Sequence, residues 1–103
     1  MLDYAREGVV IAQGKTLGDL QKDRMMQLSL LHLVGLIGEA ASRVSKPTRL
    51  KHLEIDWKAI IGMRNKIIHD YAITDLEILW KTVESNLPDL SFKLEKIISE
   101  HGS

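Results

Sequence analysis

The side chains best suited to chemistry stand together in the segment 64–71, whose sequence is Arg-Asn-Lys-Ile-Ile-His-Asp-Tyr. Arginine offers a rigid positive fork that matches phosphate oxygens. Histidine is the side chain best suited to move protons near neutral pH. Asparagine both donates and accepts hydrogen bonds, so Asn65 can orient either neighbour. Arg64, Asn65 and His69 therefore carry the groups needed for general acid–base cleavage of a phosphodiester without a metal.

A helix expected over residues 56–69 brings these side chains together, with Asp56 as its N-cap. Arg64 falls on the centre line of the apolar stripe of this helix, which consists of Trp57, Ile60, Ile61, Ile67 and Ile68. An arginine in that position is costly unless it meets an anion or a partner. Asn65 and His69 are four residues apart and therefore lie on one side of the helix. His69 is about 140° from Arg64 around an ideal helix, and the long arginine side chain could still reach it.

Each of these residues also has a structural interpretation, which periodicity alone favours. Arg64 could form an ion pair across the bundle with Glu39, which lies on a narrow polar line of the preceding helix and could orient Arg64 or Asn65. Asn65 could be a hydrogen-bonding residue near the helix end. His69 could interact with the carbonyl end of its helix, where positive charge is favourable. Tyr71 could be a half-buried aromatic residue with its hydroxyl in water.

Two earlier helices are expected to support this segment. The first covers about residues 1–13, where apolar residues repeat at spacings of three and four and Gly14 marks the end. The second runs from Asp19 or Asp23 to Ser45, and the dipeptide at 46–47, Lys-Pro, should end it. Its apolar residues cover almost the whole circumference, so neighbouring helices or a second subunit must enclose it.

A fourth helix is expected from Thr74 onward, because residues 74–77 match a capping box and apolar residues then repeat at three and four. Pro88 lies inside this pattern and should kink or split the helix. No segment alternates like a strand of useful length. Four helices with short connections predict an all-α, up-and-down four-helix bundle in which residues 1–103 form a single domain.

Composition narrows the possible functions. The absence of cysteine excludes disulfides, thiolate zinc sites and cysteine nucleophiles, and no spacing of histidines and carboxylates predicts a metal site. The apolar run Leu28–Gly38 is too short to cross a bilayer, and residues 1–6 do not resemble a secretory signal. We therefore expect a cytoplasmic protein that has no membrane partner.

Charge is unevenly distributed although the formal net charge is zero. Residues 1–69 contain 11 Lys and Arg against 7 Asp and Glu, whereas residues 70–103 contain 3 against 7. The densest basic stretch consists of Arg43, Lys46, Arg49, Lys51 and His52. A local basic surface can attract phosphate. A solvated loop with ordinary basic residues is the simpler interpretation of this stretch.

The order of the polar residues resembles the signature of the HEPN superfamily: Arg64, four residues, His69, one residue, Tyr71, with Asn65 directly after the arginine. The flanks resemble the HepT branch of that superfamily. The similar flanking segments are Ile37–Val44, Asp56–Trp57, Ile61–Asn65, Asp75–Trp80 and Leu87–Leu90. Asp70 stands where glycine is common in the family. Its carboxylate could raise the pKa of His69 or repel an RNA phosphate.

This resemblance implies a specific function. HepT proteins are toxins of type VII HepT/MntA toxin–antitoxin pairs and are described as metal-independent endoribonucleases. They form homodimers in which two motifs face one cleft. By transfer, His69 would be the acid–base, Arg64 would stabilise phosphate charge and Asn65 would position the pair. The antitoxin, an MntA-like nucleotidyltransferase, would transfer AMP from ATP to Tyr71 and block the cleft, so the toxin itself needs no cofactor.

Two other functions remain open. The chain could be a non-catalytic dimeric partner subunit that binds a nucleotidyltransferase, RNA or both, as the zero net charge, the short basic stretch and Asp70 would allow. It could also be a helical dimer with no role in nucleic-acid chemistry. Dimerisation is expected in every case, because a small bundle has too little surface of its own to cover a helix that is apolar nearly all round.

Overall fold

The computed structural model describes the backbone of residues 1–69 and 76–101 and the side chains of residues 1–64 and 76–100. This described part of the chain forms helices and turns and contains no strand, which confirms the predicted all-α class. Its elements are α1 (Leu2–Ala12), α2 (Leu17–Lys22), α3 (Arg24–Ser42), α4 (Lys46–Lys51), α5 (Trp57–His69), α6 (Leu76–Lys81), a π-helix (Thr82–Asn86) and α7 (Leu87–His101).

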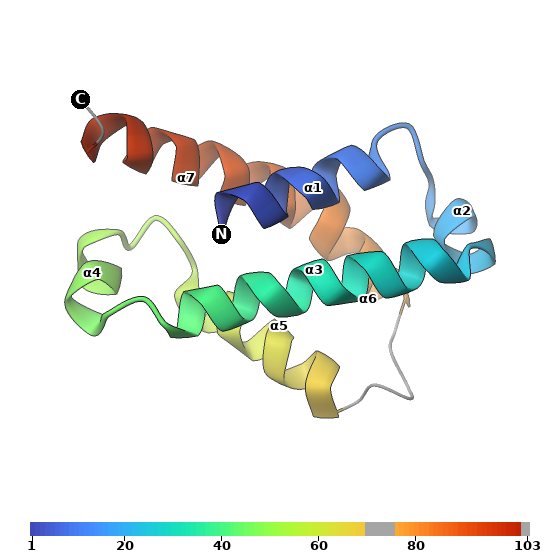
Figure 1. The fold of residues 1–103 in the computed structure, drawn as a ribbon, viewed down its shortest axis with the longest axis horizontal. Coiled ribbons are helices and arrows are strands. Elements are labelled where there is room, and N and C mark those ends of the chain that lie inside the picture. Colours follow the sequence, from blue (N-terminus) through green and yellow to red (C-terminus); the bar gives the residue numbers. More distant parts are fainter. Residues whose placement is uncertain (70–75, 102–103) are drawn as a thin grey trace.

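The long helices form an up-and-down bundle in which α3 is central (Figure 1). Helix α3 packs against α1 on one side and against α5 on another, and α1 packs against α7. Consecutive long helices run in opposite directions, as the short connections predict (Figure 1). An exposed ion pair between Arg6 and Glu95, with 2.8 Å between Nη2 and Oε1, also joins α1 to α7.

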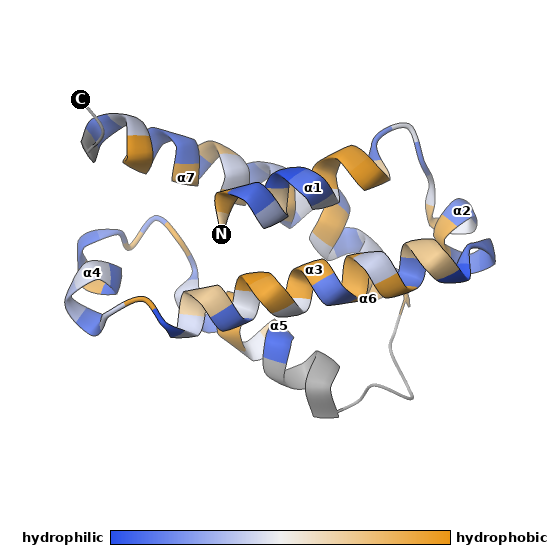
Figure 2. Ribbon diagram, in the orientation of Figure 1, coloured by the Kyte–Doolittle hydropathy of each residue, from blue (hydrophilic) through white to orange (hydrophobic). Residues whose placement is uncertain are grey.

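Helix α3 supplies much of the core. Figure 2 shows hydrophobic residues along most of its length, and the described core residues come from it and from the facing sides of its neighbours. The buried apolar residues of α3 are Met26, Leu30, Leu31, Leu33, Val34, Ile37 and Ala41. By length and composition alone, α3 could cross a membrane. In this fold it is instead the helix on which α1 and α5 pack.

The second predicted helix begins at the later of its two predicted starts, because Asp23 is the N-cap of α3 and Asp19 lies in a separate short helix. Helix α2 begins with a capping box between Thr16 and Asp19, and Asp23 then takes an extended conformation (φ −114°, ψ 99°) that separates α2 from α3. The Asp23 carboxylate accepts a hydrogen bond from the Met26 N–H at 3.1 Å. An aspartate that caps one helix while it ends another explains why the sequence pattern looked continuous.

The prediction that residues 46–47 end the second helix was wrong in its position. Helix α3 already ends at Ser42, and Lys46 and Pro47 begin α4. The hydroxyl of Ser45 caps this short helix by accepting from the Thr48 N–H at 3.3 Å. Proline is tolerated in a first helical turn, because the N–H that it lacks would have no partner there.

The interruption predicted near Pro88 is confirmed. Helix α6 passes into the π-helix, and α7 begins at Leu87, directly before Pro88. Pro88 has no N–H to donate to the carbonyl of Glu84, so the regular ladder cannot continue through this turn. The predicted capping box at Thr74 lies outside the described residues.

Candidate functional site

Helix α5 carries the motif, and its start is fixed by two hydrogen bonds. The Asp56 carboxylate accepts from the Ala59 N–H at 3.0 Å, which confirms the predicted N-cap. The indole N–H of Trp57 donates to the carbonyl of His52 at 3.0 Å. Ile60 and Met63, on the inner face of α5, pack against the core as partly buried residues. The first two turns are thus anchored before the helix reaches Arg64.

Arg64 lies where α5 crosses α3 at Gly38. Gly38 is buried, and a Cβ atom added to it would collide with Cβ of Arg64, would lie 2.8 Å from Cγ of Arg64 and would lie 3.2 Å from the carbonyl oxygen of Ile60. No larger residue fits between the two helices without moving them apart. Arg64 can approach α3 this closely because Gly38 has no side chain.

Glu39, the next residue on α3, forms an ion pair with Arg64. The distance from Nη2 of Arg64 to Oε2 of Glu39 is 2.7 Å, and the two side chains are 29% and 38% exposed. The other carboxylate oxygen of Glu39 lies 3.2 Å from Nη2 of Arg43, four residues further along the chain at the C-cap of α3. One carboxylate thus bridges two arginines. This arrangement explains how Arg64 can occupy the apolar stripe of α5, because its guanidinium reaches the Glu39 carboxylate at the edge of the bundle.

The remaining motif residues are described only in part. The backbone of Asn65 and His69 is helical, and His69 is the last residue of α5. Arg64 and His69 therefore stand one to two turns apart on the same helix. The side chains of Asn65 and His69, and all of Asp70 and Tyr71, lie outside the described residues. Their roles stay predictions.

Sequence reasoning missed the link between Arg43 and the motif. Arg43 was grouped with a basic stretch, although its spacing of four residues from Glu39 is the signal for an ion pair on one helix face. Other members of that stretch point elsewhere. The Nε of Arg49 donates to the carbonyl of Val44 at 3.1 Å, and His52 is 14% exposed beside Glu54.

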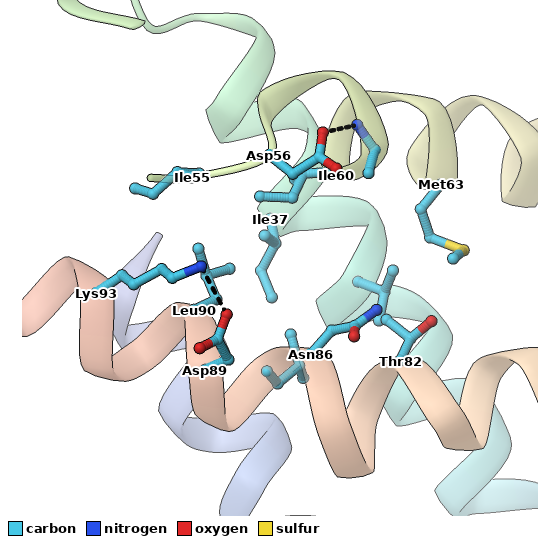
Figure 3. A pocket seen from close by; sticks show the side chains of 13 residues that line it. Ile37, Ile55, Asp56, Ile60, Met63, Thr82, Asn86, Asp89, Leu90 and Lys93 are labelled. Atoms are coloured by element: carbon cyan, nitrogen blue, oxygen red, sulfur yellow. Dashed lines mark hydrogen bonds and ion pairs between the residues drawn. The ribbon is translucent and has the colours of Figure 1, made fainter. Parts of the chain in front are cut away.

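A cavity of about 210 Å³ lies on the other side of α5, between α3, α5 and the helices that follow residue 81. Figure 3 shows Ile37, Ile60 and Leu90 on its apolar walls, with Asn86 and Lys93 among the polar residues that line it. No pattern in the sequence predicted this cavity. No group of three or more histidine, aspartate or glutamate residues with metal-binding geometry is found among the described residues.

Comparisons with known proteins identify the family. Residues 1–97 match the model of the HepT-like family, described as ribonuclease HepT-like. A provisionally named ribonuclease HepT of Thermococcus cleftensis is 35% identical over 79 residues, which is 77% of this chain and 72% of that protein. A provisionally named RNase of Caldanaerobacter subterraneus subsp. tengcongensis is 32% identical over 88 residues, or 85% and 79% of the two chains.

A third relative is a provisionally named RNase of Methanocaldococcus jannaschii, which is 26% identical over 100 residues, covering 97% of this chain and 83% of that protein. No solved structure gives a significant match to this chain. The family match extends over both α3 and α5 and therefore includes the residues that build the site. The chain belongs to the HepT-like ribonuclease family.

Proposed function

We propose that this protein is the endoribonuclease toxin of a type VII HepT/MntA toxin–antitoxin system and that it cleaves RNA without a metal. Membership of a ribonuclease family supports the reaction class. The observation that carries the proposal is the position of Arg64, which leaves the apolar interior, contacts Glu39 at 2.7 Å and stays 29% exposed at the surface. A guanidinium is a group that suits phosphate, and the ion pair restricts the direction in which this one can act.

The proposed reaction needs only a proton carrier and a phosphate ligand. The 2′-hydroxyl oxygen of the RNA forms a bond to phosphorus as the bond from phosphorus to the 5′ oxygen breaks. The proton of the 2′-hydroxyl passes to a base, and the leaving 5′ oxygen receives a proton from an acid. His69 serves in one of these proton transfers. Arg64 stabilises the charge that develops on the phosphate oxygens, and Asn65 positions the pair.

The test is RNA cleavage by the purified full-length protein in the presence of a chelator. We expect the wild-type protein to cut RNA and His69→Ala to lose the activity. His101→Ala removes a histidine from the end of α7 and is the matched control, which should cut like wild type. Equal cleavage by wild type and His69→Ala, or cleavage by neither, would contradict the catalytic proposal.

A second function is favoured by the same ion pair. A carboxylate at 2.7 Å from Arg64 is also what a purely structural contact between α3 and α5 requires. On this account the protein is a non-catalytic dimeric subunit that binds the nucleotidyltransferase, RNA or both. Toxicity in cells and complex formation would then be the same for wild type and His69→Ala.

Regulation is proposed to act at Tyr71 through an MntA-like nucleotidyltransferase. The phenol oxygen of Tyr71 would attack the α-phosphate of ATP, pyrophosphate would leave, and the phenol proton would pass to the transferase or to water. The added adenylate brings bulk and negative charge within two residues of His69, which would block an RNA-phosphate site. ATP is a substrate of the partner, and the toxin itself uses no cofactor.

Peptide mapping after incubation with the transferase and ATP should find AMP on wild type and none on Tyr71→Phe. An unmodified Tyr71 peptide in the wild type would contradict this regulation.

The proposed working form is a cytoplasmic homodimer. Residues Met25 and Leu28 on α3 are 78% and 39% exposed, although α3 is otherwise the central helix of the core. A second copy that covers this part of α3 would bury them. Two copies would also place two motifs in one particle, as the family resemblance implies.

A further inference from the structure

We propose that Arg43 is a second phosphate-binding residue of the RNA site and contacts the phosphate next to the one held by Arg64. This inference rests on the part of the proposed function in which the site binds RNA, and it does not require that the protein cleaves RNA. Arg43 lies outside the 64–71 motif, at the C-cap of α3 rather than on α5. The shared Glu39 carboxylate is what places it beside Arg64.

The geometry brings two guanidinium groups to one carboxylate. Oε2 of Glu39 is 2.7 Å from Nη2 of Arg64, and Oε1 of Glu39 is 3.2 Å from Nη2 of Arg43. The two guanidinium groups therefore contact the two oxygens of one carboxylate. Neighbouring phosphates along one strand present charges at short, regular spacing, and a pair of adjacent arginines suits such a ligand.

The charge balance of this group favours an anionic ligand. Two arginines and one glutamate leave one formal positive charge. Each guanidinium has five donors, and Arg43 contacts Glu39 through its Nη2 atom. The Arg43 side chain is 76% exposed, so its other donors face solvent. RNA phosphate can therefore reach this side chain without disturbing the core.

The neighbouring basic residues do not offer the same arrangement. Arg49 donates through Nε to the carbonyl of Val44, at the end of α3. Lys46 and Lys51 are exposed and belong to α4, beyond the end of α3. The exposed ion pair between Arg43 and Glu39, which are four residues apart, contributes little to the stability of the fold. Stability therefore does not explain why Arg43 points toward Glu39. Within this basic stretch, Arg43 contacts Glu39, the same carboxylate that Arg64 contacts.

The experiment measures RNA binding at several salt concentrations in a His69→Ala background, which keeps the RNA intact. The probe is a fluorescent single-stranded RNA, and anisotropy gives the dissociation constant. Each phosphate that a side chain neutralises adds about 0.7 to the slope of log affinity against log salt for a single strand. We expect Arg43→Gln to weaken binding at low salt and to lower the magnitude of this slope by about 0.7.

Two further variants control this measurement. Arg6→Gln removes an exposed arginine that also pairs with a glutamate, on the α1–α7 side of the bundle, and it should leave the slope unchanged. Arg43→Lys keeps the charge and should retain the slope while it loses the planar fork. Circular dichroism should show that all variants have the same helix content and melting temperature.

The possible outcomes separate this inference from the proposed catalysis. A lower slope for Arg43→Gln alone supports the second phosphate site, whether or not the wild type cleaves RNA. An unchanged slope, or an equal loss for Arg6→Gln, overturns it even if cleavage is confirmed. Failure of the His69→Ala protein to bind RNA at low salt also overturns it. Loss of binding to the nucleotidyltransferase with an unchanged RNA slope would instead assign Arg43 to the protein partner.

Discussion

Arg64 is the residue on which the site depends, and its surroundings explain how it is tolerated. Its position in the apolar stripe would be unfavourable if the guanidinium stayed inside the bundle. Gly38 lets the stem of Arg64 pass close to α3, and Glu39 meets the guanidinium at 2.7 Å where it reaches the surface. The ion pair is partly exposed, so its contribution to folding is small, and its main effect is on the direction of the side chain.

Replacing Glu39 tests this positioning role. Glu39→Gln removes the charge that restricts Arg64, and we expect cleavage of RNA to fall by about tenfold or more, because loss of alignment is costly to catalysis. The free energy of unfolding should fall by less than about 1 kcal/mol. Cleavage kinetics and chemical denaturation measure the two effects. Glu95→Gln, which breaks the ion pair with Arg6, should not change cleavage. A rise in activity for Glu39→Gln would mean that the carboxylate restrains Arg64 against catalysis.

At the scale of elements, the close crossing of α3 and α5 determines the site. Helix α5 packs mainly on α3. Its C-terminal end leads to residues outside the described part of the chain. A methyl group does not fit at Gly38, because the carbonyl of Ile60 and the stem of Arg64 face it closely. At Gly35, one turn earlier on α3, an added Cβ atom would have nothing within 4 Å. The two glycines therefore have opposite expected responses to the same substitution.

Alanine at these two positions tests the crossing. Gly38→Ala should lower the free energy of unfolding by about 1–3 kcal/mol, because the added methyl forces α3 and α5 apart. It should also reduce cleavage, since Arg64 moves with α5. Gly35→Ala adds a methyl in open space within a helix and should raise the free energy of unfolding by about 0.5–1 kcal/mol. Denaturant titration of both variants checks the signs. Equal stability of the two variants would contradict a close crossing at Gly38.

Much of this element structure could be predicted from periodicity and capping residues. The spacing of apolar residues gives the long helices, and Asp56 and Pro88 mark a start and an interruption that the structure contains. Asp23 was one of two predicted starts of the second helix, and the structure confirms it as the N-cap of α3. Asp19, the other predicted start, belongs instead to the capping box of the short helix α2, which the sequence analysis did not separate from α3. Pro47 was misassigned, since proline suits the first turn of a helix as well as the end of one.

The candidate site was only partly predictable for a related reason. A helical wheel places Arg64 on the inner face of its own helix, but it cannot show which residue of another helix meets it. Glu39 was nevertheless named as a possible partner of Arg64 because it lies on the polar line of its helix, and the ion pair confirms that prediction. Whether Arg64 also binds phosphate stays a prediction. The close approach at Gly38 and the second ion pair to Arg43 depend on how α3 and α5 cross, which is a tertiary property.

At the scale of the whole molecule, the exposed apolar residues of α3 are one feature that a single copy leaves unexplained. Met25 is 78% exposed and Leu28 is 39% exposed, and both belong to the helix that forms the centre of the bundle. Single exposed apolar residues are common on soluble proteins. Two on one side of the central helix suit an interface, and a second copy of this chain is the partner that the dimer proposal names.

A charge at this surface tests the dimer. Leu28→Glu should raise the dissociation constant of the homodimer by about tenfold or more, since a buried interface position does not accept an unpaired carboxylate. Val10→Glu places the same charge at an exposed apolar position on α1 and should leave the association unchanged. Sedimentation at micromolar concentration measures both. A wild-type protein that sediments only as a monomer would contradict the dimer itself.

The central claim is that Arg64 acts on RNA phosphate and is more than a structural ion pair. Arg64→Gln separates the two roles, and single-turnover cleavage of RNA by the folded variant is the decisive measurement. We predict that this variant keeps the helix content of the wild type and cuts at least about a hundredfold more slowly, because a preorganised donor to the reacting phosphate is lost. A folded Arg64→Gln protein that cuts RNA at the wild-type rate would contradict the account.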